Sequence, residues 1–154
     1  MKSEKKVKMG KSSRARGKAF ELKVRKHLES QGWIVVRWDK NVEFNPGEIA
    51  GVKVSFPRLI NSKPKFNPFT HSLMMNSSGF PDFICFKSFD GLWKGDWAYT
   101  IIGVECKTNG KLDKIEKEKC QWLLRNKIFN KILLISPAGT KGRDIYEEEI
   151  TIND

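Results

Sequence analysis

Long apolar stretches are missing from this sequence, and cysteine is scarce. No run approaches the roughly 18 apolar residues that a helix needs to cross a bilayer, and the charged start of the chain is not followed by the apolar segment of a secretion signal. The three cysteines, Cys85, Cys106 and Cys120, are odd in number and form no CxxC pair. This pattern argues against a disulfide scaffold or a structural zinc site. We therefore expect a soluble, intracellular and cytoplasmic protein with reduced cysteines.

Acidic residues are also fewer than basic residues. Eighteen Asp and Glu face 29 Lys and Arg, which gives a formal charge of +11. Such an excess favours a polyanionic partner, nucleic acid above all, because counterions released from phosphates drive binding. Solubility alone is the plainer explanation of the excess, so charge does not decide the function. Hydrophobic residues make up 39% of the 154 residues, which suits one globular core rather than two.

The chain divides into a basic start and one domain. Residues 1–13 are rich in Lys without apolar periodicity, so we expect a flexible basic arm ahead of a single domain that covers residues 14–154. Apolar residues at helical spacing predict a first helix over about 13–31. Four prolines among Asn, Ser and Gly mark an insertion at about 39–78, for which the sequence defines no more than a strand or hairpin.

The remaining segments predict strands and one further helix. Strands are expected over 33–38, 79–87, 99–108 and the run KILLISPAG, a helix over LDKIEKEKCQWLLRN, and an edge strand or a solvated acidic segment over RDIYEEEITIND. The second and third of these strands should be antiparallel neighbours, because a turn-rich connection joins them. The order predicts an α/β fold with a central mixed β-sheet flanked by helices.

Three ionisable residues fall on the predicted strand pair. Asp82 stands at the start of one strand, whereas Glu105 and Lys107 are two residues apart in the next and so share a face of the sheet. A carboxylate between apolar neighbours in a strand needs a partner, because an unpaired buried charge costs several kcal/mol. The sequence therefore predicts that these three side chains converge, with a metal ion as their partner.

The residue types suit hydrolysis of a phosphodiester. Asp82 and Glu105 offer the oxygen ligands that Mg²⁺ or Mn²⁺ prefers, and the ammonium of Lys107 can hold the attacking water and offset charge on the phosphorus. An isolated ExK is more often an ion pair on a solvated edge strand. Here GFPD, an apolar strand, the run IIGVECK, Gly110 and a helix occur in order, and this conjunction favours a catalytic site.

The segments GFPDFICF and GVECKTNGKLDKIEKEKCQWLL, about half of the chain, resemble the core of the PD-(D/E)XK nuclease superfamily. Within it they are most similar to the virus-type replication and repair nuclease domain (VRR-NUC), whereas SRARGKAFELKVRKHLESQGW resembles the first helix of archaeal Holliday junction resolvases. Both branches are DNA nucleases. The resemblance implies a restriction-endonuclease-like core, but neither branch predicts the insertion at 39–78.

Carried onto this chain, the resemblance implies a metal site and a water-positioning lysine. Asp82 and Glu105 would ligate the metal, the backbone carbonyl of Cys106 would be a further ligand, and Lys107 would position the water. Asp82, Glu105 and Lys107 are therefore predicted to be catalytic.

Two further catalytic candidates lie on the helices. Glu21 borders the apolar stripe of the first helix and can face the sheet, although an exposed ion pair with Arg25 is the alternative. Gln121 matches the glutamine that follows the ExK strand in several branches of the superfamily, and a surface Gln is the alternative.

The function favoured by these patterns is a Mg²⁺-dependent DNA endonuclease that reads DNA structure, such as a junction, flap or branch. Phosphate contacts are expected from Arg14, Arg16, Lys18, Lys111 and Lys114. One alternative is a sequence-specific restriction-type endonuclease with the insertion as its recognition element, and another is a non-catalytic nucleic-acid-binding module. Paired incision at a junction would need a homodimer.

Overall fold

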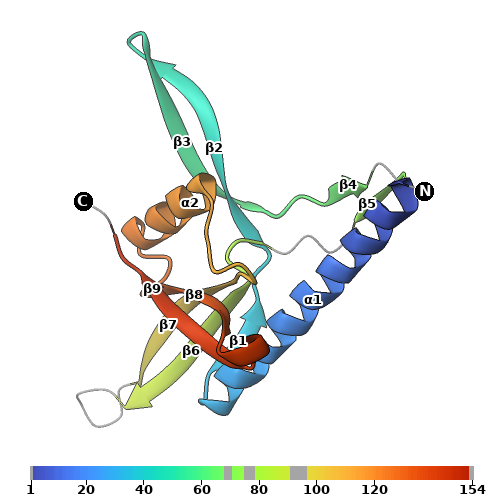
Figure 1. Ribbon diagram of the computed structural model, residues 1–154. Helices are drawn as coiled ribbons and strands as arrows, with labels where there is room; N and C mark the ends of the chain where they lie inside the picture. Colours follow the sequence, from blue (N-terminus) through green and yellow to red (C-terminus); the bar gives the residue numbers. More distant parts are fainter. Residues whose placement is uncertain (1, 68–70, 75–78, 91–96, 153–154) are drawn as a thin grey trace.

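A five-stranded mixed sheet lies at the centre of the computed structural model, which describes residues 2–67, 71–74, 79–90 and 97–152. Its strands, in spatial order, are β1 (Ile34–Arg37), β6 (Phe83–Asp90), β7 (Trp97–Cys106), β8 (Lys131–Ala138) and β9 (Asp144–Ile150). β7 and β8 are parallel and the other neighbours are antiparallel. The helices are α1 (Lys2–Ser30) and α2 (Lys114–Arg125), on opposite faces of the sheet (Figure 1). The predicted α/β fold with a central mixed sheet between helices is confirmed.

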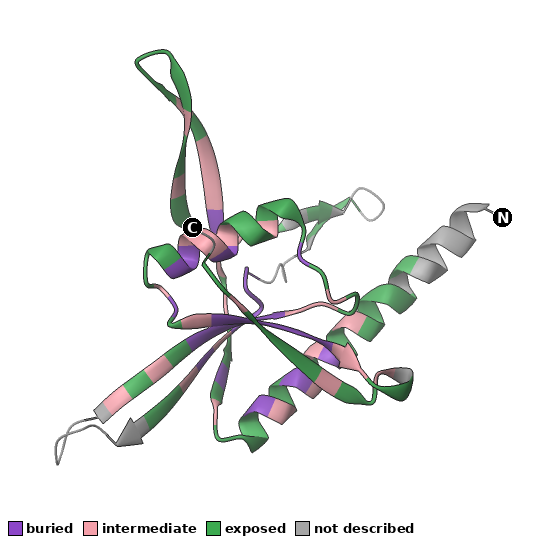
Figure 2. Ribbon diagram, turned by 60° about the vertical axis from the view of Figure 1, so that its left-hand side comes forward, coloured by how far each residue is buried: buried purple, intermediate pink, exposed green. Residues whose placement is uncertain are grey.

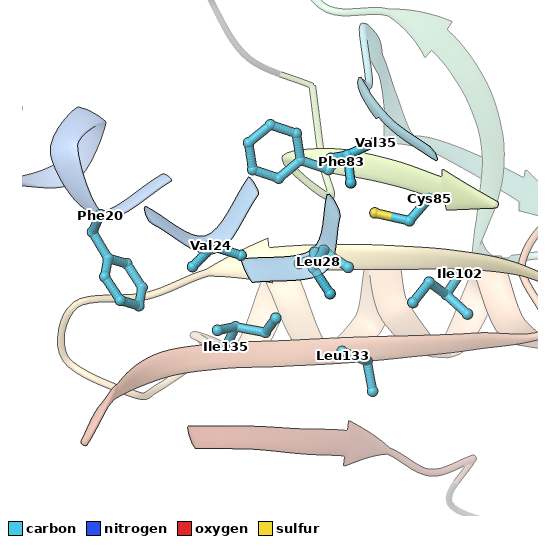
Figure 3. Close-up of a cluster of buried hydrophobic side chains, with 10 residues drawn as sticks. Phe20, Val24, Leu28, Val35, Phe83, Cys85, Ile102, Leu133 and Ile135 are labelled. Atoms are coloured by element: carbon cyan, nitrogen blue, oxygen red, sulfur yellow. The ribbon is translucent and has the colours of Figure 1, made fainter. Parts of the chain in front are cut away.

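Strand residues alternate between two cores because successive side chains point to opposite faces. The first core joins the apolar stripe of α1 to the sheet; it contains Phe20, Val24, Leu28, Val35, Phe83, Cys85, Ile102, Val104, Leu133 and Ile135 (Figure 3). The second core joins α2 to the other face and includes Cys120, Leu123, Leu124, Phe129, Ile132 and Leu134. In Figure 2 the buried residues follow the middle of the sheet and the inner sides of both helices. One sheet therefore serves two hydrophobic layers.

The first helix begins at Lys2, well before the expected start near residue 13. Residues 2–13, for which the sequence predicts a flexible basic arm, are helical and continuous with the rest of α1. The physical reason is propensity: this segment has no proline, and five of its twelve residues are Lys, which favours helix without an apolar stripe. The N-terminal half of α1 projects beyond the sheet (Figures 1 and 2). Within the described part of the chain, no helix is long and apolar enough to span a membrane.

The segment from 39 to 78 contains a long β-hairpin. β2 (Lys40–Ile49) and β3 (Val52–Asn61) pair antiparallel over their whole length, and the ribbon projects from the body of the protein (Figure 1). Two short strands, β4 (Lys65–Asn67) and β5 (Ser72–Met74), follow and pair with each other. Pro46 and Pro57 obscured the hairpin in the sequence, but both strands of a two-stranded ribbon are edge strands, where proline is tolerated.

The C-terminal segment forms the predicted edge strand. β9 pairs with β8, and its three consecutive acidic residues are exposed, so the strand and the solvated acidic segment are the same element. The side chain of Glu147 lies 2.9 Å from the imidazole of His27 and so connects β9 to α1.

Close backbone packing fixes the segment that leads into β6. Gly79 N–H donates to the Trp38 carbonyl (2.9 Å), Phe80 N–H to the Lys40 carbonyl (2.8 Å), and Trp38 N–H to the Asp82 carbonyl (3.1 Å). A Cβ at position 79 would lie 2.2 Å from the Lys40 carbonyl oxygen. The following peptide bond, Phe80–Pro81, is cis. Only glycine at position 79 allows this approach, which places Asp82 at the start of β6.

We expect Gly79→Ala to destabilise the protein by about 1–3 kcal/mol, because the added methyl meets backbone atoms that cannot move independently. Urea unfolding followed by circular dichroism measures this change. Gly17→Ala is the matched control: nothing lies within 4 Å of its Cβ position in α1, so this change should stabilise the helix by up to about 1 kcal/mol. Equal stability of Gly79→Ala and the wild type would contradict the tight packing.

Candidate active site

The pairing of β6 with β7 brings Asp82 and Glu105 together. Phe83 pairs with Val104 in antiparallel strands, so Asp82, which precedes Phe83, lies beside Glu105, which follows Val104. The N–H of Cys106 donates to the Asp82 carboxylate (2.9 Å), and the N–H of Asp82 donates to Glu105 Oε2 (3.1 Å). The exposed fractions of Asp82 and Glu105 are only 8% and 5%. Two carboxylates therefore lie side by side in the interior, at the end of two neighbouring strands.

Burial makes both carboxyl groups weaker acids than they are in water. Burial raises the pKa of Asp82 to about 6, with a further rise from the charge of Glu21 and opposing effects from the hydrogen bond of Cys106 and from nearby cations. Burial raises the pKa of Glu105 to about 8, and the charge of Asp82 adds to the rise. Two negative charges in this environment need compensation, which nearby cationic groups or a divalent cation can supply.

Lys107 supplies part of that compensation. Its ammonium Nζ lies 3.1 Å from Glu105 Oε1 and also bonds to Glu116, at the start of α2. Burial tends to lower the pKa of Lys107, but the contacts with Glu116 and Glu105 outweigh it, and the pKa is raised. The amine is therefore held as an ammonium between two carboxylates. The structure thus brings Asp82, Glu105 and Lys107 together, as the sequence predicts.

Glu116 is a site residue that the sequence interpretation missed. Its Oε2 accepts a hydrogen bond from the N–H of Asp113 (2.9 Å), and Asp113 Oδ1 accepts one from the N–H of Glu116 (2.8 Å), which is a reciprocal capping box. The other oxygen, Oε1, contacts Lys107. The DxxE spacing would have revealed the cap, but only the folded structure places its glutamate beside the lysine.

Glu21 lies on the site's side of α1. Its side chain, 23% exposed, pairs with Arg37 at the end of β1, and its charge contributes to the raised pKa of Asp82. The alternative pairing with Arg25 is not formed, because Arg25 bonds to Glu29 at 2.8 Å. Glu21 therefore borders the carboxylate pair as expected, although Arg37 holds its carboxylate.

Gln121 lies apart from the three central residues. Its Nε2 donates to the carbonyl of Thr151, just after β9, at 2.7 Å. The buried Cys120 belongs to the core between α2 and the sheet, and the next residue along a helix is rotated by about 100°. The geometry therefore gives no support to the role that the resemblance implied for Gln121.

The predicted phosphate-binding residues are exposed. Arg14, Arg16 and Lys18 lie on α1, and Lys111 and Lys114 lie at the entry to α2. The second group lines a groove of 1320 Å³ between α2, the β2–β3 hairpin and β9; its lining includes Phe44, Pro57, Lys111, Leu112, Lys114, Ile115, Lys117, Trp122, Glu148 and Ile150. Asp82, Glu105 and Lys107 are not among the lining residues, so this groove adjoins the loop after Lys107 without containing the carboxylate pair.

The donor set fits Mg²⁺ or Mn²⁺. No group of three or more His, Cys, Asp or Glu side chains suited to a metal occurs among the described residues, which does not match a closed zinc or calcium cage. Two carboxylates are what Mg²⁺ usually takes from a protein, with waters and phosphate oxygens completing its shell. The N–H and carbonyl of one strand residue point to the same side, so the Cys106 carbonyl shares the side on which its N–H meets Asp82.

Comparisons of the chain with protein-family models, with curated proteins and with solved structures found no match.

Without metal, we expect the melting temperature to fall as the pH rises from about 4 to 8. A carboxyl group whose folded pKa is raised stabilises the fold at low pH, and this contribution is lost as the pH passes the folded values of about 6 and 8. At pH 8, Glu105→Gln should raise the melting temperature by roughly 2–4 °C, because it removes a buried charge.

Differential scanning fluorimetry in EDTA at several pH values measures this effect, with Glu29→Gln as the control because Glu29 is exposed and paired on α1. Identical pH profiles of the wild type and Glu105→Gln would contradict the interpretation.

Proposed function

We propose that this chain is a metal-dependent DNA endonuclease with a restriction-endonuclease-like core of the PD-(D/E)XK type. One observation carries the proposal: Asp82 and Glu105 are buried beside each other at the ends of adjacent strands, and the Lys107 ammonium lies 3.1 Å from Glu105. In a non-catalytic binding module, the two buried acids would destabilise the fold without contributing to function.

Each of these residues has its own role in the proposed hydrolysis. Asp82, Glu105 and the Cys106 carbonyl would hold Mg²⁺ or Mn²⁺, which when bound polarises the phosphodiester and lowers the pKa of water. Lys107 orients the water whose oxygen attacks phosphorus, and its positive charge offsets the negative charge that develops there. As the oxygen of the water bonds to phosphorus, the water loses a proton to solvent; the bond from phosphorus to the leaving oxygen breaks, and that oxygen takes up a proton from solvent.

DNA is the proposed substrate because cations are exposed on two elements near the site. Arg14, Arg16 and Lys18 on α1 and the lysines at the entry to α2 can contact phosphates without reading bases. This arrangement supports recognition of DNA structure, such as a junction, flap or branch. The β2–β3 ribbon favours a second candidate, a sequence-specific endonuclease, because a two-stranded ribbon fits the major groove.

Cleavage should depend on the metal and on all three central residues. With Mg²⁺ or Mn²⁺, we expect Asp82→Asn, Glu105→Gln and Lys107→Ala each to reduce cleavage by at least about 10²-fold, the scale of losing one transition-state contact. Lys107→Ala should retain the thermal stabilisation by Mn²⁺ that the two carboxylate variants lose. Lys127→Ala, in the exposed turn after α2, is the control.

The substrates are linear duplex, single-stranded, flap and four-way-junction DNA, with EDTA as the blank. Preference for one branched substrate supports the first candidate, and a fixed cut sequence in linear duplex supports the second. Binding of DNA without metal-dependent cleavage of any of these substrates would overturn the proposal.

Glu116 should act on catalysis through Lys107. We expect Glu116→Ala to lower kcat by about tenfold or more, with KM for DNA unchanged, because Lys107 loses the carboxylate that fixes its position. Asp113→Ala is the matched control, since it breaks the same capping box without touching Lys107. It should reduce stability by about 1 kcal/mol and leave kcat intact. Equal losses of kcat in both variants would mean that Glu116 acts only through the helix.

A further inference from the structure

The β2–β3 ribbon has one face packed on the body of the protein and one face turned outward. Val42 belongs to the core between α2 and the sheet, and Phe44 packs against that core. Successive strand residues point to opposite faces and paired residues share a face, so Glu43 and its partner Arg58 lie on the other, outward face. In the half of the ribbon nearest the body, this outward face carries Asn41, Glu43, Asn45, Phe56, Arg58 and Ile60.

Three charged side chains form a network on the outward face. Arg58 donates to Glu43 Oε2 through Nε (3.2 Å) and Nη2 (2.8 Å), and Lys63 Nζ donates to Glu43 Oε1 (2.6 Å). The bonds from Lys63 and from Arg58 lower the pKa of Glu43, so its carboxylate is charged near neutral pH. The exposed fraction of the side chain is 24% for Glu43 and 65% for Arg58. Glu43 therefore orients Arg58 while much of the Arg58 side chain remains accessible.

The donors that remain on Arg58 match the major-groove edge of a guanine. A guanidinium carries five N–H donors in a fixed planar fork, and Glu43 accepts one from Nε and one from Nη2. One N–H of Nη2 and both of Nη1 are left, and the two that point along the end of the fork can bind two neighbouring acceptors. Guanine O6 and N7 are two such acceptors, and they lie in the major groove, which admits a two-stranded ribbon.

The ribbon begins beside the candidate active site. The carbonyl of Lys40, the first residue of β2, accepts a hydrogen bond from the N–H of Phe80, which precedes Asp82 by two residues. Glu43 follows Lys40 by three residues, about 10 Å along the strand. This length corresponds to about three base pairs of DNA. A duplex with its scissile phosphate at Asp82 can therefore extend to Arg58.

The charge of the outward face favours DNA as its partner. Arg58 and Lys63 outnumber Glu43 in the network, and the chain as a whole carries +11, so a polyanion complements this surface. Phe56, 48% exposed on the same face, offers the apolar contact that a thymine methyl group takes in the major groove. Exposed ion pairs contribute little to stability, so holding the ribbon together is a weak explanation of the network.

We propose that Arg58 recognises a guanine in the major groove of duplex DNA, a few base pairs from the cut, and that Glu43 is the positioning residue for its guanidinium. Arg58 keeps its bonds to Glu43 and donates from Nη1 and Nη2 to O6 and N7 of the base. The inference rests on the proposed function, because it adds a base preference to the phosphate contacts of a DNA nuclease.

A binding selection without metal tests the base preference separately from cleavage. The full chain is incubated in EDTA with linear duplexes that contain a randomised segment, and the bound duplexes are sequenced. We expect guanine to be enriched at one position. Replacing that guanine with 7-deazaguanine, which lacks the N7 acceptor but still pairs with cytosine, should weaken binding by about fivefold.

Arg58→Lys is the informative variant, because lysine keeps the charge but lacks the planar fork. We expect it to bind random duplex within about twofold of the wild type, since the charge is unchanged, and to lose about tenfold or more of the preference for guanine over adenine at the selected position. Glu43→Gln should lower the same preference by a smaller factor. Arg25→Lys is the matched control: Arg25 is also exposed and bonded to one glutamate, but on α1, and this variant should keep the preference.

Equal binding of all duplex sequences by the wild type would overturn the proposal. A guanine preference that survives Arg58→Lys, or that is insensitive to 7-deazaguanine, would also overturn it. Selective binding without metal-dependent cleavage of the selected duplex would refute the nuclease alone, whereas metal-dependent cleavage without a base preference would refute the role of the ribbon alone. Absence of DNA binding would refute both.

Discussion

Much of this structure depends on two buried carboxylates, Asp82 and Glu105, which lie beside the ammonium group of Lys107. Asp82 and Glu105 are almost fully buried, and their charged forms are unfavourable there unless backbone N–H groups, Lys107 or a cation compensate. The compensating groups come from separate parts of the chain. Cys106 and Asp82 donate backbone hydrogen bonds, and Glu116 holds Lys107 in place. The arrangement is stable only while the strands, the segment before β6 and the start of α2 keep their relative positions.

The local structure around the pair is correspondingly constrained. Gly79 allows the chain to pass against the backbone of Trp38 and Lys40, and this contact fixes where β6 begins. At the other side, the capping box of α2 links the stability of a helix to the position of the Lys107 ammonium. The two buried acids, which destabilise the fold when charged, are thus supported by backbone contacts that need no bound ion, in keeping with the general trade between stability and function.

Some elements project beyond the core, and one side of the sheet is only partly covered. α1 and the β2–β3 hairpin both project from the body, and the sheet is packed on the α1 side but only partly on the α2 side (Figures 1 and 2). Exposed cations lie on the projecting helix and at the entry to α2, whereas large apolar side chains are exposed on β1 (Ile34 and Val36) and β7 (Tyr99 and Ile101). Charged and apolar surfaces are therefore separated.

The sequence by itself determined the elements and their inward faces. Apolar periodicity located the core half of α1, the strands of the central sheet and α2, but not β2 to β5, and the two-residue spacing of Glu105 and Lys107 placed both on one face. Only the tertiary structure decided which distant groups meet. It placed Glu116 beside Lys107 and Gln121 beside the Thr151 carbonyl, extended α1 to Lys2, and left large apolar side chains of β1 and β7 exposed. The reason is physical: side-chain periodicity is a local property of the chain, whereas contacts between elements depend on strand order, helix rotation and the reach of side chains across space.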